Sequence, residues 1–307
     1  MKNKQNAIFK IIVMMLIAVS LLLVGCDKTP QDNGTSNTGS GGPSQEPPVE
    51  IPATVTTTSW QILEGKPTET TVYKYTTDKP GPKIVIVGGI HGDEVAGWTA
   101  ALRLVNSLST EKGICGEILL IPQANILADN ARVRYNVKGT GVTYSDLNRS
   151  FEIGRQSTAK AATIEISDAL VSAIDEFIGN ASIVNPYDVC IVDLHESRGS
   201  YTDGTAAAGY LGDQILCTNN PLFTDDLLWH YNKTYRAEGD PNFRAEGAVK
   251  QGSFALNFSS KYPDATVFTI ETNRGYINNQ DTVLLEKRVT QQLNILQALF
   301  DYAWQRI

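Results

Sequence analysis

Residues 84–94 read Ile-Val-Ile-Val-Gly-Gly-Ile-His-Gly-Asp-Glu, an apolar run that ends in glycines, a histidine and two acids. Such a run is typical of a strand buried on both faces of a sheet. His91 leaves the tip of this strand, and Glu94 enters the first turn of the next helix. The glycines let the backbone turn tightly close to a ligand. The stretch therefore predicts a central strand that presents a histidine and a glutamate to one ion.

A second histidine occupies a similar place. His195 follows the apolar run 189–194, and the chain has only three histidines. The carboxyl ends of parallel strands meet at one edge of a sheet, where ligands bind. Two histidines and a glutamate leave a fourth position for water, as catalytic zinc requires. We therefore expect one zinc ion on His91, Glu94 and His195, and we expect the third histidine, His230, to be a surface or packing residue.

A carboxylate stands at a third strand end. Glu271 follows the apolar residues 267–270. In this place a glutamate either forms a salt bridge or helix contact, or acts as a general base. A zinc-bound water has a pKa of roughly 7, so a neighbouring carboxylate can take its proton. We predict the catalytic role for Glu271.

The segment 145–151, Ser-Asp-Leu-Asn-Arg-Ser-Phe, offers groups that suit a substrate and a metal ligand. Arg149 can hold a carboxylate through two parallel hydrogen bonds, and Asn148 can add a donor. Asp146 can accept the free ring N–H of a zinc-bound histidine.

Two further arginines, Arg132 and Arg134, lie shortly before this segment. Taken alone, arginines are more often solvated surface residues. Near a metal, however, one of the two can place positive charge where an oxyanion develops. Spacing does not decide between them, and Arg132 is also a candidate for binding substrate.

Strands that alternate with long helices predict a mainly parallel sheet with helices on both faces. Thr54–Trp60 and Thr70–Thr76 are expected to form a hairpin around residues 64–67. The other expected strands are 83–88, 118–122, 189–194 and 266–270. The expected helices are 94–108, 158–179, ended by Gly179, and 281 to about 304, with Asp281 as N-cap.

The N-terminus has the pattern of a targeting segment. Residues 1–26 combine early lysines with a short apolar core and end in Cys26. The core is short for a membrane span and suits a signal peptide. We expect a bacterial lipoprotein signal with Cys26 as the lipidated residue, the alternative being an ordinary signal peptide. Residues 27–52, rich in Ser, Gly and Pro, are then a disordered tether.

Residues 53–307 are long enough for one catalytic domain with a large core. The formal charge of −7 and the pI of about 5.1 argue against a nucleic-acid partner. Three cysteines remain after Cys26, and none forms a CxxC pair. Cys190 is expected as a buried thiol, and a disulfide between Cys115 and Cys217 stays open.

Several motifs, in this order, resemble those of the zinc carboxypeptidase superfamily over about residues 80–275. They are Gly88–Glu94, Arg134-Tyr135-Asn136, Asp146-Leu147-Asn148-Arg149, Asp193-Leu194-His195 and Thr269-Ile270-Glu271. Pancreatic-type members usually carry arginine before the glutamate ligand, where this chain has Asp93. The chain is more similar here to the succinylglutamate desuccinylase/aspartoacylase branch and to murein-peptide amidases.

The resemblance implies an α/β fold with a mixed, mostly parallel, about eight-stranded sheet. It also implies roles for the candidate residues: His91, Glu94 and His195 bind zinc, and Glu271 is general base and acid. Arg134 stabilises the oxyanion, while Asn148 and Arg149 hold a substrate carboxylate. Neither Tyr262 nor Tyr276 has the interval of the substrate-capping tyrosine.

We expect a lipid-anchored zinc hydrolase on the extracytoplasmic face of the cell membrane. It would cut an amide in peptides or cell-wall stem peptides beside a free carboxylate. An alternative is hydrolysis of N-acyl amino acids at the same metal site. A third interpretation is a solute-binding lipoprotein without catalysis, which has no need of Glu271 or a metal triad.

Overall fold

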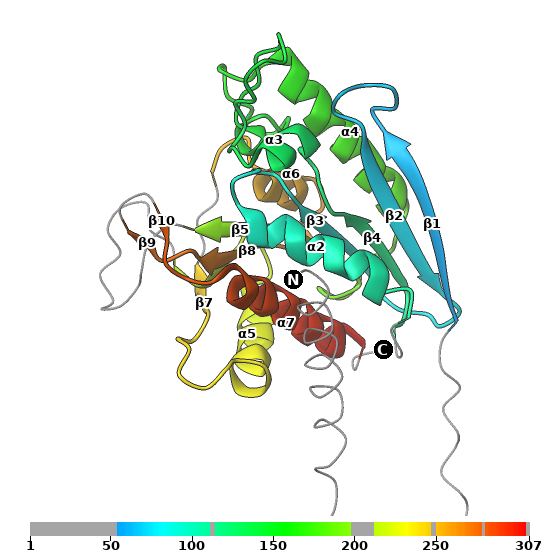
Figure 1. The fold of residues 1–307 in the computed structure, drawn as a ribbon. Helices are drawn as coiled ribbons and strands as arrows, with labels where there is room; N and C mark the ends of the chain where they lie inside the picture. The colour runs from blue at the N-terminus through cyan, green and yellow to red at the C-terminus, as the bar shows by residue number, and fades with distance from the viewer. Residues whose placement is uncertain (1–53, 111–113, 198–211, 247–249, 278–279, 305–307) are drawn as a thin grey trace, which may run out of the picture. The chain divides into compact units, whose positions relative to one another are not determined.

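The computed structural model describes residues 54–110, 114–197, 212–246, 250–277 and 280–304. Its centre is an eight-stranded sheet with the order β1-β2-β4-β3-β5-β8-β6-β7 (Figure 1). The strands are β1 (Val55–Ile62), β2 (Thr70–Thr77), β3 (Lys83–Gly88), β4 (Glu117–Ile121), β5 (Val189–Ser197), β6 (Gln214–Cys217), β7 (Arg244–Glu246) and β8 (Thr266–Asn273). β9 (Tyr276–Ile277) and β10 (Gln280–Asp281) pair with each other.

The middle of the sheet is parallel. β4, β3, β5 and β8 run in the same direction, while β1, β2 and β6 join antiparallel neighbours. The carboxyl ends of β3, β5 and β8 therefore meet at one edge. The prediction of a mixed, mostly parallel sheet is confirmed.

Helices cover both faces of the sheet. Side chains alternate along each buried strand, so apolar side chains lie on both faces and pack against helices there. Ile84 and Ile86 of β3 enter one core cluster, with α2 (Val95–Ser107), α5 (Pro221–Thr234) and α7 (Leu285–Trp304). Val85 and Val87 enter the other, with α4 (Ala161–Ile178) and α6 (Phe254–Lys261). The remaining helices are α3 (Ile126–Ala131) and the 3-10 turn η1 (Leu147–Arg149).

One predicted helix start is wrong. Asp281 is not the N-cap of the last helix, because α7 begins at Leu285 and Asp281 pairs in β10. Its carboxylate accepts hydrogen bonds from Arg274 at 2.9 Å and Arg288 at 3.2 Å. The two arginines thus hold Asp281 in the hairpin. Gly179 ends α4 as expected, with φ of +54°.

The sequence left open a disulfide between Cys115 and Cys217. In the structure these two cysteines are not bonded to each other. Cys190 is a buried thiol, as predicted. Within the described ranges, no helix is both long enough and apolar enough to span a membrane. The predicted signal segment, Cys26 and the tether lie outside the described residues.

Candidate metal centre

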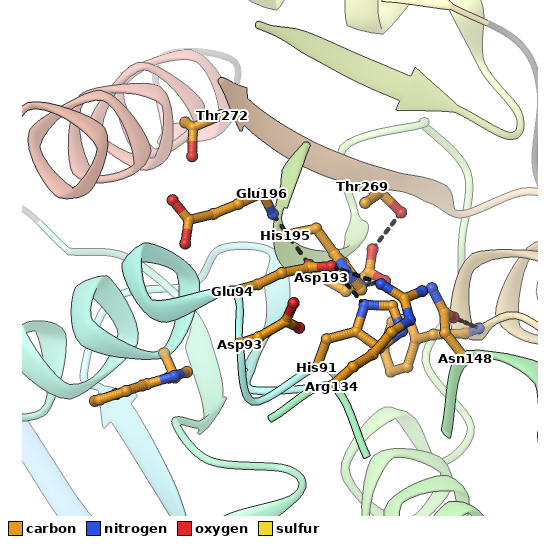
Figure 2. Close-up of polar contacts among 12 residues, drawn as sticks. His91, Asp93, Glu94, Arg134, Asn148, Asp193, His195, Glu196, Thr269 and Thr272 are labelled. Atoms are coloured by element: carbon orange, nitrogen blue, oxygen red, sulfur yellow. Dashed lines mark hydrogen bonds and ion pairs between the residues drawn. The ribbon is translucent and has the colours of Figure 1, made fainter. Parts of the chain in front are cut away.

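Three side chains from two separate parts of the chain meet at the edge formed by β3, β5 and β8. His91 follows β3, Glu94 is the N-cap of α2, and His195 lies in β5. Each offers a ligand atom, and these atoms all lie within 4.8 Å of one another. All three side chains are buried. Figure 2 shows them pointing toward one another.

Both imidazole rings direct the same nitrogen toward Glu94. Nδ1 of His91 lies 2.8 Å from one carboxylate oxygen, and Nδ1 of His195 lies 2.6 Å from the other. Two nitrogens and a carboxylate are a donor set that zinc takes up readily. The residues present therefore fit a zinc ion.

The second nitrogen of each ring has its own carboxylate. Nε2 of His91 lies 2.9 Å from Asp146, and Nε2 of His195 lies 3.0 Å from Asp193. An N–H donated from Nε2 leaves Nδ1 as the lone-pair atom and fixes the orientation of the ring. Asp146 stands where the sequence predicted it. Asp193 was missed, although its place two residues before His195 puts both side chains on one face of β5.

Close packing brings Glu94 to His195. A Cβ added at Gly97 in α2 would lie 2.4 Å from the carbonyl oxygen of Leu194 in β5. Only glycine allows the helix to approach the strand so closely. The backbone N–H of Glu196 then reaches Glu94 at 3.1 Å. The carboxylate is thus held by β5 as well as by its own helix.

Mutual electrostatics keeps these groups charged. Burial raises the pKa of Glu94, but His91 and His195 outweigh this and hold it well below its ordinary value. Burial lowers the pKa of His195, but Glu94 and Asp193 raise it well above the ordinary value. Burial also raises the pKa of Asp146, but the hydrogen bond and charge of His91 outweigh this and lower that pKa below its ordinary value. A divalent cation would take the place of the proton on Nδ1 of His195.

Of the two candidate arginines, Arg134 lies in the site. Its guanidinium donates to Glu94 and to Asp146, each at 3.1 Å. Burial lowers the pKa of Arg134, but Glu94 and Asp146 raise it overall. Arg132 is the left-handed C-cap of α3, with φ of +51° and an exposed side chain. Within the described residues it makes none of these hydrogen bonds.

Glu271 is the strand neighbour of His195. The two residues are paired in the parallel register of β5 and β8, so their side chains share a face of the sheet. Glu271 is 8% exposed. Burial raises the pKa of its carboxyl to about 8. The charges of Glu94 and Asp193 raise this pKa further, whereas those of His195 and Arg134 lower it. A metal ion beside it would lower this pKa again.

Asn148 and Arg149 lie in η1, next to the Asp146 that contacts His91. The backbone N–H of Asn148 donates to Asp146 at 2.9 Å, and its side-chain oxygen accepts from the N–H of Phe254 at 2.8 Å. The Arg149 guanidinium donates to the carbonyl of Asn148. Both side chains are half-buried. They stand beside the metal centre, and Asn148 also helps to hold the start of α6.

Two polar groups behind the site were not predicted from the sequence. Glu196 caps the start of α2 by accepting from the N–H of Ala96 at 2.8 Å, and it pairs with Arg288 of α7. Gln292 donates to the carbonyl of His195 at 2.7 Å. Their sequence signal is weak, because contacts between β5 and α7 span almost a hundred residues.

Two residues considered in the sequence analysis, His230 and Tyr262, make their contacts away from the metal ligands. The His230 ring packs edge-on against Tyr235 and lies 3.5 Å from Asp301, as a packing residue would. The Tyr262 hydroxyl donates to Asp175 of α4 at 2.7 Å. Tyr262 is therefore engaged with α4.

Replacing Asp193 by asparagine is expected to weaken zinc binding by about 10–100-fold, the usual cost of losing a partner that orients a metal ligand. The amide cannot match a carboxylate as acceptor for the His195 ring. Competition with a fluorescent chelator measures this affinity. Asp188→Asn, just before β5, is the control, since the Asp188 carboxylate accepts from the N–H groups of Val184 and Asn185. Equal affinity in both variants would remove Asp193 from this role.

One family model matches part of the chain. Residues 80–207 match the family model of the succinylglutamate desuccinylase/aspartoacylase catalytic domain. This segment contains His91, Glu94 and His195 but not Glu271. No curated protein sequence matches the chain.

Several solved structures share the fold. The tripeptide-bound cell shape determinant Csd4 of Helicobacter pylori aligns with a TM-score of 0.55 at 14% identity, over 76% of this chain and 55% of that one. Carboxypeptidase A of Helicoverpa armigera aligns with a TM-score of 0.55 at 14% identity, over 82% of this chain and 69% of that one. Succinylglutamate desuccinylase of Vibrio cholerae aligns with a TM-score of 0.53 at 18% identity, over 80% of this chain and 66% of that one. The chain therefore has a zinc carboxypeptidase-like fold, although it spans only about half the length of Csd4.

Proposed function

We propose that this chain is a zinc-dependent amide hydrolase. The observation that supports this most is the convergence of both histidine Nδ1 atoms on Glu94, with Glu271 in register beside His195. A zinc ion held there would polarise an amide carbonyl and acidify a water molecule. A binding protein needs no buried carboxylate beside such a metal, so Glu271 favours catalysis over simple ligand binding.

The protein's own residues would supply the remaining chemistry. Glu271 takes a proton from water and delivers it to the leaving amine. The Arg134 guanidinium, which is already beside Glu94, stabilises the negative charge that develops on the carbonyl oxygen. Asp146 and Asp193 keep both rings in the tautomer that leaves Nδ1 available.

For the substrate, we propose peptides or cell-wall stem peptides with a free carboxylate. The fold is shared with a tripeptide-bound cell shape determinant and with a carboxypeptidase A. The second candidate is an N-acyl amino acid, which the match to the succinylglutamate desuccinylase/aspartoacylase domain favours. A lipid anchor at Cys26, proposed from the sequence, would hold the enzyme at the extracytoplasmic membrane face and favours the first candidate.

A direct assay separates these substrates. The purified full chain is analysed for metal and then incubated with peptidoglycan-derived peptides, N-acetylaspartate or succinylglutamate, with and without a chelator. Mass spectrometry identifies the products. We expect about one zinc per chain and chelator-sensitive cleavage of the peptides. Turnover of the acyl amino acids alone would favour the second candidate, and a metal-free chain without turnover would refute the hydrolase.

Arg149→Ala is expected to weaken the use of substrates that carry a free carboxylate more than that of their amidated forms. Hydrogen bonds to charged groups are worth about 1.5–3 kcal/mol, so kcat/KM should fall by roughly 10–100-fold for the carboxylate form. Steady-state kinetics on matched peptide acids and amides measures this difference. Arg103→Ala is the control, because Arg103 of α2 pairs with Glu286 at 2.8 Å on the surface. An equal loss on acid and amide would assign Arg149 to structure.

A further inference from the structure

Helix α3 packs against the turn that carries His91. The backbone N–H of Ala124 donates to the carbonyl of Gly88 at 2.9 Å, and that of Asn125 donates to Gly89 at 3.0 Å. Both donors lie just before α3, and both acceptors lie just before His91. The turn is thus bonded to α3 as well as to the sheet.

The contact leaves no room for side chains on the turn. A Cβ added at Gly92 would lie 2.0 Å from the carbonyl carbon of Ala128. A Cβ added at Gly89 would lie 2.3 Å from one carboxyl oxygen of Asp129 and 3.0 Å from the other. Gly89 also has φ of +75°, which favours glycine. The carboxyl group of Asp129 therefore covers Gly89 directly.

This carboxyl group is buried in an unusual way. Asp129 is 1% exposed, and neither of its carboxyl oxygens has a hydrogen-bond partner among the residues that the structure describes. An isolated ionised carboxylate is very costly in such surroundings, whereas a neutral acid is much less so. Burial accordingly raises the pKa of Asp129 well above its ordinary value. Burial of this kind favours the neutral acid over the carboxylate.

The neighbouring side chain has the same property. The side-chain nitrogen of Asn125, one helical turn before Asp129, is also buried, and it has no hydrogen-bond partner in the described part of the chain. Shape, and not a set of side-chain hydrogen bonds, thus fits α3 to the glycine turn. A group of the same size and neutral charge should serve equally well at position 129.

We propose that Asp129 is a positioning residue for His91: its buried carboxyl group packs on Gly89 and fixes the turn from which His91 reaches the metal. Asp129 touches neither the substrate nor the metal. The inference rests on the proposed function, because the placement of His91 matters for zinc only if His91 binds it.

Zinc affinity and thermal stability of the full chain test this inference together. Asp129→Asn keeps the size of the neutral acid, whereas Asp129→Ala leaves Gly89 uncovered. Thr224→Ala is the matched control, since Thr224 is fully buried in α5 and bonds Cys217 instead of the metal centre. Chelator competition gives the zinc affinity, and thermal unfolding without metal gives the stability. If Asp129→Ala does not fold, Asp129→Ser replaces it.

We expect Asp129→Asn to bind zinc as tightly as the wild type. Asp129→Ala should bind about 10–100-fold more weakly, as when a group that orients a ligand is lost. Thr224→Ala should lose stability but keep its zinc affinity. Wild-type zinc affinity in Asp129→Ala would overturn the positioning role. If Asp129→Asn lost as much zinc affinity as Asp129→Ala, a neutral group of the same size could not replace the Asp129 carboxyl. A wild type that binds no zinc would instead refute the proposed function, and the inference with it.

Discussion

Replacing Glu271 by glutamine is expected to lower kcat by about 10²–10⁴-fold, the range that general acid–base catalysis supplies. The amide has nearly the same size as the carboxyl but cannot take a proton from water. Glu271 lies beside His195 in the sheet without being one of the three candidate ligands. Zinc should therefore remain bound at about one ion per chain, and the loss should appear in kcat more than in KM.

The measurement combines steady-state kinetics with metal analysis of the same sample. Glu117→Gln is the matched control, because Glu117 lies at the opposite end of a strand in the same sheet and pairs with Lys74. It should keep full activity. Unchanged turnover in Glu271→Gln would exclude Glu271 as the base, and loss of zinc would show that Glu271 holds the metal.

The second large effect is expected at Glu94. Glu94→Ala removes the group on which both ring nitrogens converge, so zinc binding and turnover should be lost together. The loss of affinity should exceed the roughly 10–100-fold that accompanies loss of an orienting partner. Without Glu94, the pKa of His195 should also fall, because Glu94 is the foremost of the groups that raise it.

Thermal unfolding gives an independent measure of the same loss. Zinc at about 100 times its Kd stabilises a protein by about 2.7 kcal/mol. In a domain of this size, that corresponds to a rise in Tm of roughly 5–10 °C. The wild type should show this rise and Glu94→Ala should show none. Glu69→Ala is the control, since Glu69 is a half-buried residue of the turn between β1 and β2, where its carboxylate accepts from the N–H of Gly65 at 2.6 Å. A zinc-dependent rise that survives in Glu94→Ala would place the metal elsewhere.

The sequence predicted the central strands and the sites at their ends because both depend on local patterns. Apolar runs marked β3, β5 and β8, and parallel strands must meet at one edge, so His91, His195 and Glu271 could be placed together. The short strands β6 and β7 lack such a run, since each has at most four residues. Their place in the sheet is set by tertiary contacts with β8 and with each other.

The supporting groups of the site were harder to predict. Asp193 could have been found from its spacing to His195 along the strand. Arg288 and Gln292 lie in α7 and contact β5 only because the chain folds back over it. Asp129 gives no signal in the sequence, because a buried carboxyl without a partner breaks the usual rule for charged residues. Only the packing of α3 on Gly89 explains it.

The position of β1 bears on how the protein would respond to mechanical load. Among the described strands, β1 lies at an edge of the sheet and pairs with β2 alone, and it is the first described element after the N-terminal segment (Figure 1). A pulling force applied through that segment would act on β1 first. β2 and β4 separate β1 from β3, the first strand of the sheet that leads into the site. β2 and β4 therefore stand between the point of loading and the metal ligands.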